Sequence, residues 1–350
     1  MKENKKKSSR LRLIRLDKDG RGVSKSAQDM KPGFKRFFRT LFDNFGKLVS
    51  TNIIMVLGNF PLFFLIMNLS GYFKTELNLP MYDLFQNLAG HMTGAELTPY
   101  HMTLFALKGL QGQVLYDTAV NYVFYAISAL TLFSFGIVNV GTAYILRNIA
   151  SGEPVFVWQD FIYAVKRNYK QALPFGIADG LICILLGFNI FSLVTTSDQF
   201  FVSVMFWSNV VIAIVYFFMR YYIYVQMVTF KLSVFKIIKN SLIFSLLGLK
   251  RNLCATLGIV LCVLLELMFL FGTGGILIPF AIAAPLAILF SAMAYMKVYA
   301  AYFKIKEVMI DPYYEAHPEE KPVSDTESIM RDDVTERERL EKIKAQAKNK

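Results

Sequence analysis

The chain has 350 residues, of which 55% are hydrophobic and 18% are charged, and its formal net charge is +12 at pH 7. A soluble protein carries charge on about a quarter of its residues. The deficit lies in several apolar stretches long enough to cross a bilayer, which takes roughly 20 residues each. The composition therefore excludes a soluble globular protein and predicts an integral membrane protein.

The N-terminal region is strongly basic. Residues 1–52 hold fifteen Lys and Arg but no apolar core followed by a small-residue cleavage site. We therefore expect no cleavable signal peptide, and a first span that stays in place as an anchor. Residues 1–30 are predicted to form a disordered leader. Attraction to anionic lipid, about 1 kcal/mol per basic residue, explains the net charge, so nucleic acid is excluded as a partner.

Six transmembrane helices are predicted, and they form three hairpins in an all-α fold. The expected spans are 52–73, 121–146, 173–196, 200–226, 253–272 and 276–303. The third and fourth spans are separated only by TTSDQ, and the fifth and sixth only by the turn from Gly272 to Gly275. Glycine accepts turn dihedrals without steric cost, so such a short connection suits a helical hairpin. The membrane domain is expected over 31–305, with a long outer loop over 74–120 and a charged cytoplasmic tail over 306–350.

The basic residues of the connections predict the orientation. Five Lys or Arg lie in 227–252 and four in 147–172, whereas the 74–120 loop has only Lys74 and Lys108. Positive residues stay on the cytoplasmic side of a membrane. Both termini are therefore predicted to be cytoplasmic.

Each hairpin is predicted to follow an amphipathic helix that lies in the membrane interface. In the second unit, Ser151 to Pro154 is typical of a helix start, with a serine cap and an early proline. Apolar residues then recur every three or four positions, which places one apolar stripe against the lipid. The interfacial residues singled out in this helix are Trp158, Phe161, Arg167 and Asn168.

Similar amphipathic segments occupy 33–49 and 231–250, and the three units share a weak repeat. The stretches DNFGKLVSTNI, KRNYKQALPFG and KRNLCATLGIV place Asn44, Asn168 and Asn252 in register. We interpret this as three units of interfacial helix plus hairpin.

Four ionisable residues inside the spans are candidate functional groups, because charge in a bilayer is costly. Asp179 lies about 9 Å from the cytoplasmic start of its span by the helical rise. Arg220 and Lys297 lie near the cytoplasmic ends of theirs, so either could pair with Asp179, and either could instead reach to the interface. Glu266 lies deeper, about 20 Å from the start of the fifth span. Structural ion pairing and a polar path through the membrane both remain open for these groups.

Several separated blocks resemble one bacterial family. The stretch VGTAYILRNIASGEPVFVWQDFIYAVKRNYKQAL, with FFRTLFDNFGKLVSTNIIMVLGNFPLFFL and KIIKNSLIFSLLGLKRNL, is similar to the YesL-like integral membrane proteins. The resemblance covers roughly 34–65 and 130–260 but neither the outer loop nor the two tails. That family has no established catalytic residues, and its members look like accessory proteins of polysaccharide use and sugar uptake.

The leading hypothesis is a non-enzymatic accessory or scaffold protein of the bacterial cytoplasmic membrane, associated with carbohydrate uptake. Its expected partners are the lipid bilayer, a transporter membrane subunit and a second copy of the chain. No catalytic residue, cofactor or metal site is predicted. The alternative is a small-solute transporter or channel with a polar path near Asp179 or Glu266. A membrane enzyme acting on lipid or glycan is a third interpretation, which lacks a recognisable site.

Overall fold

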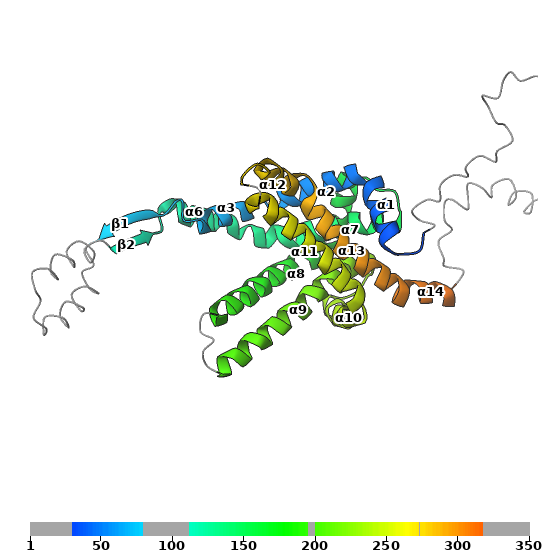
Figure 1. Ribbon diagram of the computed structural model, residues 1–350. Helices are drawn as coiled ribbons and strands as arrows, with labels where there is room; N and C mark the ends of the chain where they lie inside the picture. The colour runs from blue at the N-terminus through cyan, green and yellow to red at the C-terminus, as the bar shows by residue number, and fades with distance from the viewer. Residues whose placement is uncertain (1–29, 80–111, 195–199, 273, 318–350) are drawn as a thin grey trace, which may run out of the picture.

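The computed structural model describes residues 30–79, 112–194, 200–272 and 274–317. These residues are mostly helical, with one two-stranded ribbon (Figure 1). The elements in chain order are α1 (Phe34–Asp43), α2 (Phe45–Gly58), α3 (Pro61–Leu69), β1 (Thr75–Leu79), β2 (Gly112–Tyr116), α6 (Ala119–Ala129), α7 (Thr131–Ser151), α8 (Val157–Val194), α9 (Phe200–Thr229), α10 (Val234–Leu247), α11 (Leu249–Phe271), α12 (Ile278–Ala284), η2 (Pro285–Leu289), α13 (Phe290–Ile305), η3 (Lys306–Ile310) and α14 (Asp311–Ala316).

The predicted spans correspond to helices of the structure. Five helices are long and apolar enough to cross a membrane, and the pair α2–α3 makes a sixth if the two are counted as one span. That pair is bent by 62° where Asn59 and Phe60 precede Pro61. Proline lacks a backbone N–H and cannot continue the preceding turn, so the helix bends there. The helical architecture is thus that of a multi-pass membrane protein.

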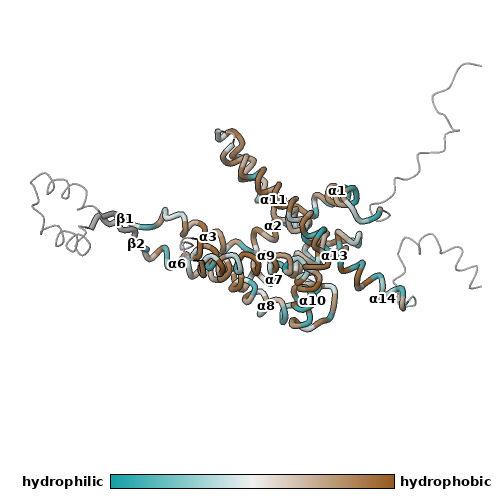
Figure 2. The backbone as a smooth tube through the Cα atoms, turned by 60° about the horizontal axis from the view of Figure 1, so that its bottom comes forward, coloured by the Kyte–Doolittle hydropathy of each residue, from teal (hydrophilic) through white to brown (hydrophobic). Residues whose placement is uncertain are grey.

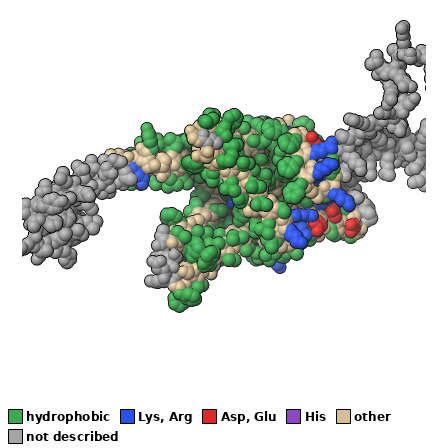
Figure 3. All heavy atoms as spheres, viewed as in Figure 1, with side chains coloured by type: hydrophobic (Ala, Val, Ile, Leu, Met, Phe, Trp, Pro, Cys, Tyr) green, Lys and Arg blue, Asp and Glu red, His purple; other side chains and the backbone are tan. Residues whose placement is uncertain are grey.

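The ends of the described chain lie together. Figure 1 shows α1 and α14 at the same end of the molecule, and Figure 3 shows most of the visible Lys and Arg side chains gathered there. We call this the basic end. At the far side, β1 and β2 pair antiparallel from Thr75 opposite Tyr116 to Leu79 opposite Gly112. The ribbon is a departure from a purely helical chain. The rest of the predicted outer loop, 80–111, lies outside the described residues, as do TTSDQ and most of the predicted leader and tail.

Burial is concentrated in the half of each span nearest the basic end. In α8 the buried residues stop at Asp179, in α9 they begin at Phe218, and in α11 they stop at Ala255. The buried parts of α2, α7 and α13 complete this region, which we call the junction. Beyond it, α3 with α6, the far halves of α8 with α9, and the far half of α11 with α12 form three arms. Figures 1 and 2 show the arms projecting in three different directions.

Small and polar residues explain where the helices pack. Gly136 of α7 and Gly176 of α8 face each other so closely that a Cβ on Gly136 would overlap the carbonyl oxygen of Ala172. Small residues permit this close approach between membrane helices. The Asn52 side chain, fully buried, donates to the carbonyl oxygens of Pro285 and Leu286 at 2.8 and 2.9 Å. These carbonyls belong to the π-helical turn η2, so α2 is fixed against the last span.

The prediction of three separate interfacial helices is wrong for the second unit. The segment with Trp158, Phe161, Arg167 and Asn168 is the first part of α8, which runs unbroken for 38 residues and contains Pro174. Nothing between Val157 and Pro174 breaks a helix, and proline within a membrane helix is tolerated when neighbouring helices support it. The helices α1 and α10 are separate from α2 and α11, as predicted, but they are shorter than the predicted segments 33–49 and 231–250. Residues 45–49 belong to α2.

The predicted helix start at Ser151 to Pro154 is also wrong. Ser151 is the last residue of α7, and Gly152 ends that helix in the left-handed conformation with φ 92°. The next helix is capped instead by Asp160, whose Oδ2 accepts the backbone N–H of Phe156 at 2.9 Å. A serine before Gly-Glu-Pro is compatible with a helix start and with a helix end. Here the glycine forms the C-cap of the preceding helix.

The last helix extends beyond the predicted membrane domain. It runs from Ile278 through two π-helical turns to Ala316, past the expected boundary at 305. The turn before it carries Gly274 and Gly275 with φ 59° and 93°, as expected for a glycine hairpin.

Candidate functional site

The junction holds a cluster of ionisable side chains between α8 and α9. Asp179 and Cys183 are four residues apart on α8, and Tyr216, Arg220 and Tyr224 are spaced by four on α9. Residues four apart share one face of a helix. The spacing therefore brings two polar faces together within otherwise apolar spans. We call these five residues the Asp179 cluster.

Asp179 is fully buried and accepts hydrogen bonds on both oxygens. Its Oδ1 accepts from the Tyr216 hydroxyl at 2.7 Å and lies 2.9 Å from Nε of Arg220. Its Oδ2 accepts from the Tyr224 hydroxyl at 2.6 Å and from the same Nε at 3.2 Å. A buried carboxylate requires this degree of pairing.

Arg220 is held on a second side. Its guanidinium carbon lies 5.2 Å from the ring centre of Phe135 on α7, a cation–π distance. The bonds to Asp179 use only Nε, and the two terminal amino groups make no hydrogen bond to any described residue. Arg220 thus links α7, α8 and α9 while keeping donors free.

A small cavity of about 60 Å³ lies beside Arg220, where α7, α9 and α13 meet. Its lining includes Asn139 of α7 and Lys297 of α13. The Asn139 amide nitrogen is buried and has no hydrogen-bond partner among the described residues. Lys297 likewise makes no ion pair with any described residue. Since one water needs about 10–15 Å³ of such space, the cavity has room for a few waters or one small anion.

The charges around the cavity do not balance. One carboxylate, Asp179, stands against the cations of Arg220 and Lys297, and the buried Asn139 amide nitrogen adds a free donor. A partly enclosed site with excess positive charge and free N–H groups favours an anion or a carbonyl oxygen.

The structure therefore brings together three of the four predicted intramembrane residues. Asp179 and Arg220 form an ion pair, and Lys297 lines the adjacent cavity. Glu266 is not part of this site. It lies in the far half of α11, is partly buried, and makes no hydrogen bond or ion pair with any described residue.

The residues predicted for the second interfacial helix divide into two kinds. Trp158 is 56% exposed, as a lipid-facing residue would be. Phe161 packs over Gly141, where a Cβ would overlap its ring. Arg167 donates to the carbonyl oxygen of Val228 at 2.7 Å, and Asn168 to that of Ala164 at 2.9 Å. The bond of Asn168 lies within α8, whereas the contacts of Phe161 and Arg167 reach α7 and α9, so this part of α8 packs on the junction.

Sequence reasoning missed Tyr216 and Tyr224, and it interpreted Asn139 only as a polar residue that packs between helices. The signal for the tyrosines was present, because they flank Arg220 at four-residue spacing. Tyr222 was missed too, and its hydroxyl donates to Asn252 at 2.7 Å. Nothing in the sequence marks Asn139 as unpartnered, since that depends on which helix faces it.

Within the described ranges, no three His, Cys, Asp or Glu side chains lie close enough to hold a metal ion. Comparison of the chain with protein-family models, with curated proteins and with solved structures found no match in any of the three.

Proposed function

We propose that this chain is a non-enzymatic accessory protein of the bacterial cytoplasmic membrane, whose three arms bind transmembrane helices of a partner protein. The observation that carries the proposal is the state of the polar groups in two of the arms, the far halves of α8 with α9 and of α11. Glu266 and Asn189 make no hydrogen bond to any described residue, and Asn209 donates only within its own helix, to Met205. A polar side chain that faces lipid is costly, so partner helices that satisfy these groups would be stabilising.

The shape of the arms supports the same proposal. The candidate spanning windows of α9 and α11 have none of their residues buried inside the structure, and that of α8 has 6%. Large apolar side chains cover all sides of these helices, among them Phe188, Phe191, Trp207 and Leu264. Figure 3 shows open space between the α3–α6 arm and the α8–α9 arm, and a partner helix would lie there.

The orientation is proposed from the charge distribution, and the partner from the family resemblance. Both ends of the described chain lie at the basic end, and positive residues stay cytoplasmic, so we place both termini in the cytoplasm. The resemblance to YesL-like proteins makes the membrane subunit of a carbohydrate transporter the partner to test first. A second copy of the chain is the alternative partner.

The proposal is tested with a photo-crosslinking amino acid at Leu185, Ile212 or Leu264, each more than half exposed on an arm. Crosslinking in native membranes, followed by mass spectrometry, should capture one membrane protein in stoichiometric yield. Phe156, which is 67% exposed near the basic end, is the matched control and should not capture it. Adducts with lipid alone at all three arm positions would contradict the proposal, whereas adducts with the chain itself would identify a homo-oligomer.

The cavity beside Arg220 favours one second candidate, a carrier or channel for a small anion. Proteoliposomes that contain the protein would then release chloride faster than empty ones. Lys297→Met should abolish that release, and Lys236→Met, at an exposed lysine of α10, should not. Glu266→Gln separates the two candidate functions. It should leave chloride release unchanged, because Glu266 lies outside the cavity lining, and it should weaken partner binding, because Glu266 lies in an arm.

A further inference from the structure

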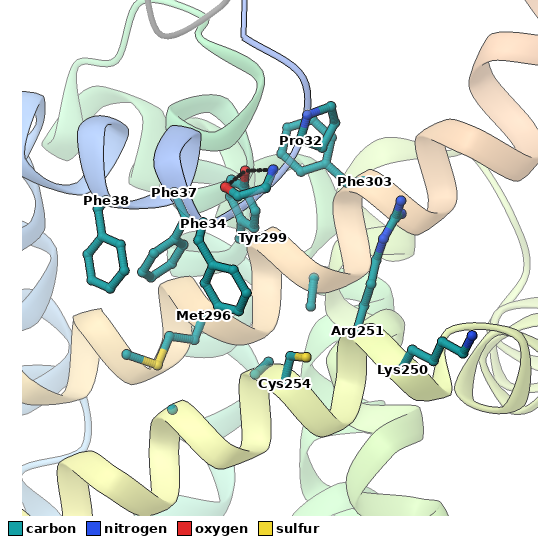
Figure 4. A pocket seen from close by; sticks show the side chains of 14 residues that line it. Pro32, Phe34, Phe37, Phe38, Lys250, Arg251, Cys254, Met296, Tyr299 and Phe303 are labelled. Carbon is teal, nitrogen blue, oxygen red and sulfur yellow. Dashed lines mark hydrogen bonds between the residues drawn. The ribbon is translucent and has the colours of Figure 1, made fainter.

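A second and larger hollow lies at the basic end between α1, α11 and α13. Its volume is about 350 Å³, within the range of ligand sites, and most of its lining is aliphatic or aromatic. Figure 4 shows Phe34, Phe37 and Phe38 pointing down from α1, Tyr299 of α13 pointing up toward α1, Met296 of α13 pointing toward α11, and Cys254 on the facing side of α11. We call this hollow the α1–α11 groove.

Small residues keep the groove open. Its α11 side carries Cys254, Ala255 and Gly258, and a Cβ at Gly258 would come within 2.9 Å of the Met296 sulfur. The next residues of α11, Leu253 and Leu257, are large and lie outside the lining. The hollow therefore follows from which face of α11 bears the small side chains.

The groove is polar at one end only. Lys250 and Arg251 line it in the first turn of α11, and Gly258 lies about 10 Å further along by the helical rise. Because α11 runs away from the basic end, Lys250 and Arg251 lie near the surface of the basic end. The apolar lining of the groove lies deeper in the molecule. A molecule with an anionic head and a long apolar arm fits this order.

Lys250 and Arg251 have N–H donors that no described residue accepts from. Nη2 of Arg251 pairs with Glu307 at 2.8 Å, but Nη1 is buried without a hydrogen-bond partner among the described residues. Glu307 is also shared with Lys304 at 3.2 Å, and Lys250 makes no ion pair within the described chain. Glu307 thus offsets part of the charge of Arg251 and Lys304, and Lys250 is not offset by any described acid. Lys250 and Arg251 also lie in the first turn of α11, where the partial positive charge of the helix N-terminus adds to the attraction for an anion.

We propose that the α1–α11 groove binds one anionic phospholipid. An acyl chain lies between Phe34, Cys254 and Met296, and the phosphate contacts Lys250 and the exposed part of the Arg251 side chain. The basic end lies at headgroup depth once the apolar spans are in the bilayer, so the lipid is present at high concentration. Other occupants fit less well: the leader, 1–29, carries ten Lys and Arg and would be repelled by these cations. The proposal does not depend on the arms binding a partner.

The test is native mass spectrometry of the full chain, delipidated in mild detergent and titrated with phosphatidylglycerol or phosphatidylcholine. The first phosphatidylglycerol should bind at least tenfold more tightly than the first phosphatidylcholine. Lys250→Gln with Arg251→Gln should remove that preference. The matched double variant Lys236→Gln with Lys239→Gln loses two exposed lysines of α10 at the same end and should keep it.

A second pair of variants probes the acyl chain without changing charge. Cys254→Trp fills the groove and should weaken both lipids at this site at least tenfold, whereas Leu253→Trp, on the neighbouring face, should not. Equal binding of the two lipids, unchanged preference in the Lys250/Arg251 variant, or unchanged binding in Cys254→Trp would each overturn the proposal. Binding that occurs only after residues 1–29 are deleted would also overturn it, because the leader would then be the occupant.

Discussion

The junction and the arms are parts of the same helices, yet they pack differently. At the junction, Tyr222 and Tyr295 are fully buried, whereas Phe188 and Leu264 in the arms are more than half exposed. Hydrophobicity does not separate the two regions, since lipid tails are as apolar as leucine and give helices no reason to leave them. What the junction has is glycine at helix crossings and polar side chains with partners on another helix. In the α8–α9 and α11–α12 arms, Asn189, Asn209 and Glu266 have no such partners among the described residues. The α3–α6 arm is held within itself, because Asn68 and Asn121 are buried and hydrogen-bond to each other.

The largest effect on stability is expected when the polar contacts of Asp179, at the centre of the junction, are removed. Asp179→Leu leaves Arg220 without its carboxylate and two tyrosine hydroxyls without their acceptor, which should lower the free energy of unfolding by about 3 kcal/mol. A denaturant titration in mixed micelles measures this. Asp179→Leu with Arg220→Met should lose less than the sum of the two single variants. A single variant as stable as the wild type would show that the cluster does not hold the junction.

Glycine gives a matched comparison between the two regions. Gly136→Ala pushes a methyl group into the backbone of α8, so stability should fall by about 2 kcal/mol. Gly187→Ala, in an arm with no atom within 4 Å of the added Cβ, should instead gain about 0.5 kcal/mol from helix propensity. Equal effects in thermal unfolding would contradict the division into junction and arms.

Two asparagines, one in the junction and one in an arm, give the same comparison with a smaller expected change in stability. Asn52→Leu deprives the carbonyls of Pro285 and Leu286 of their donor and should cost about 2 kcal/mol at most. Asn209→Leu, whose amide bonds only to its own helix, should change stability by less than about 0.5 kcal/mol. Chemical denaturation of the two variants side by side decides this, and a larger loss at Asn209 would refute it.

The smallest effect is expected in the arms themselves. Leu264→Ala should lower stability by less than about 0.5 kcal/mol, because lipid or detergent replaces the lost contact. Ile145→Ala, at a fully buried junction residue, should cost about 2 kcal/mol or more. If both variants unfold at the same temperature, the arms are packed as tightly as the junction.

The sequence by itself determined the spans and most of the local structure. The lengths of the apolar runs predict the helices, and glycine at 274 and 275 predicts a turn, because bilayer thickness and backbone sterics act locally. The sequence also pointed to Asp179 and Arg220 as partners, since charge within a span must be paired. It failed at Ser151 to Pro154, where a helix end and a helix start share the same residue types.

Only the tertiary structure decided how the helices meet. Three features depend on which helix faces lie opposite each other. The segment at Trp158 is part of α8 and packs on the junction, Tyr216 and Tyr224 both bond to Asp179, and Glu266 lies outside this site. Helical periodicity shows which residues share a face but not which face another helix will cover. In a bilayer, where burial alone gives no preference, a few glycines and polar pairs make that choice.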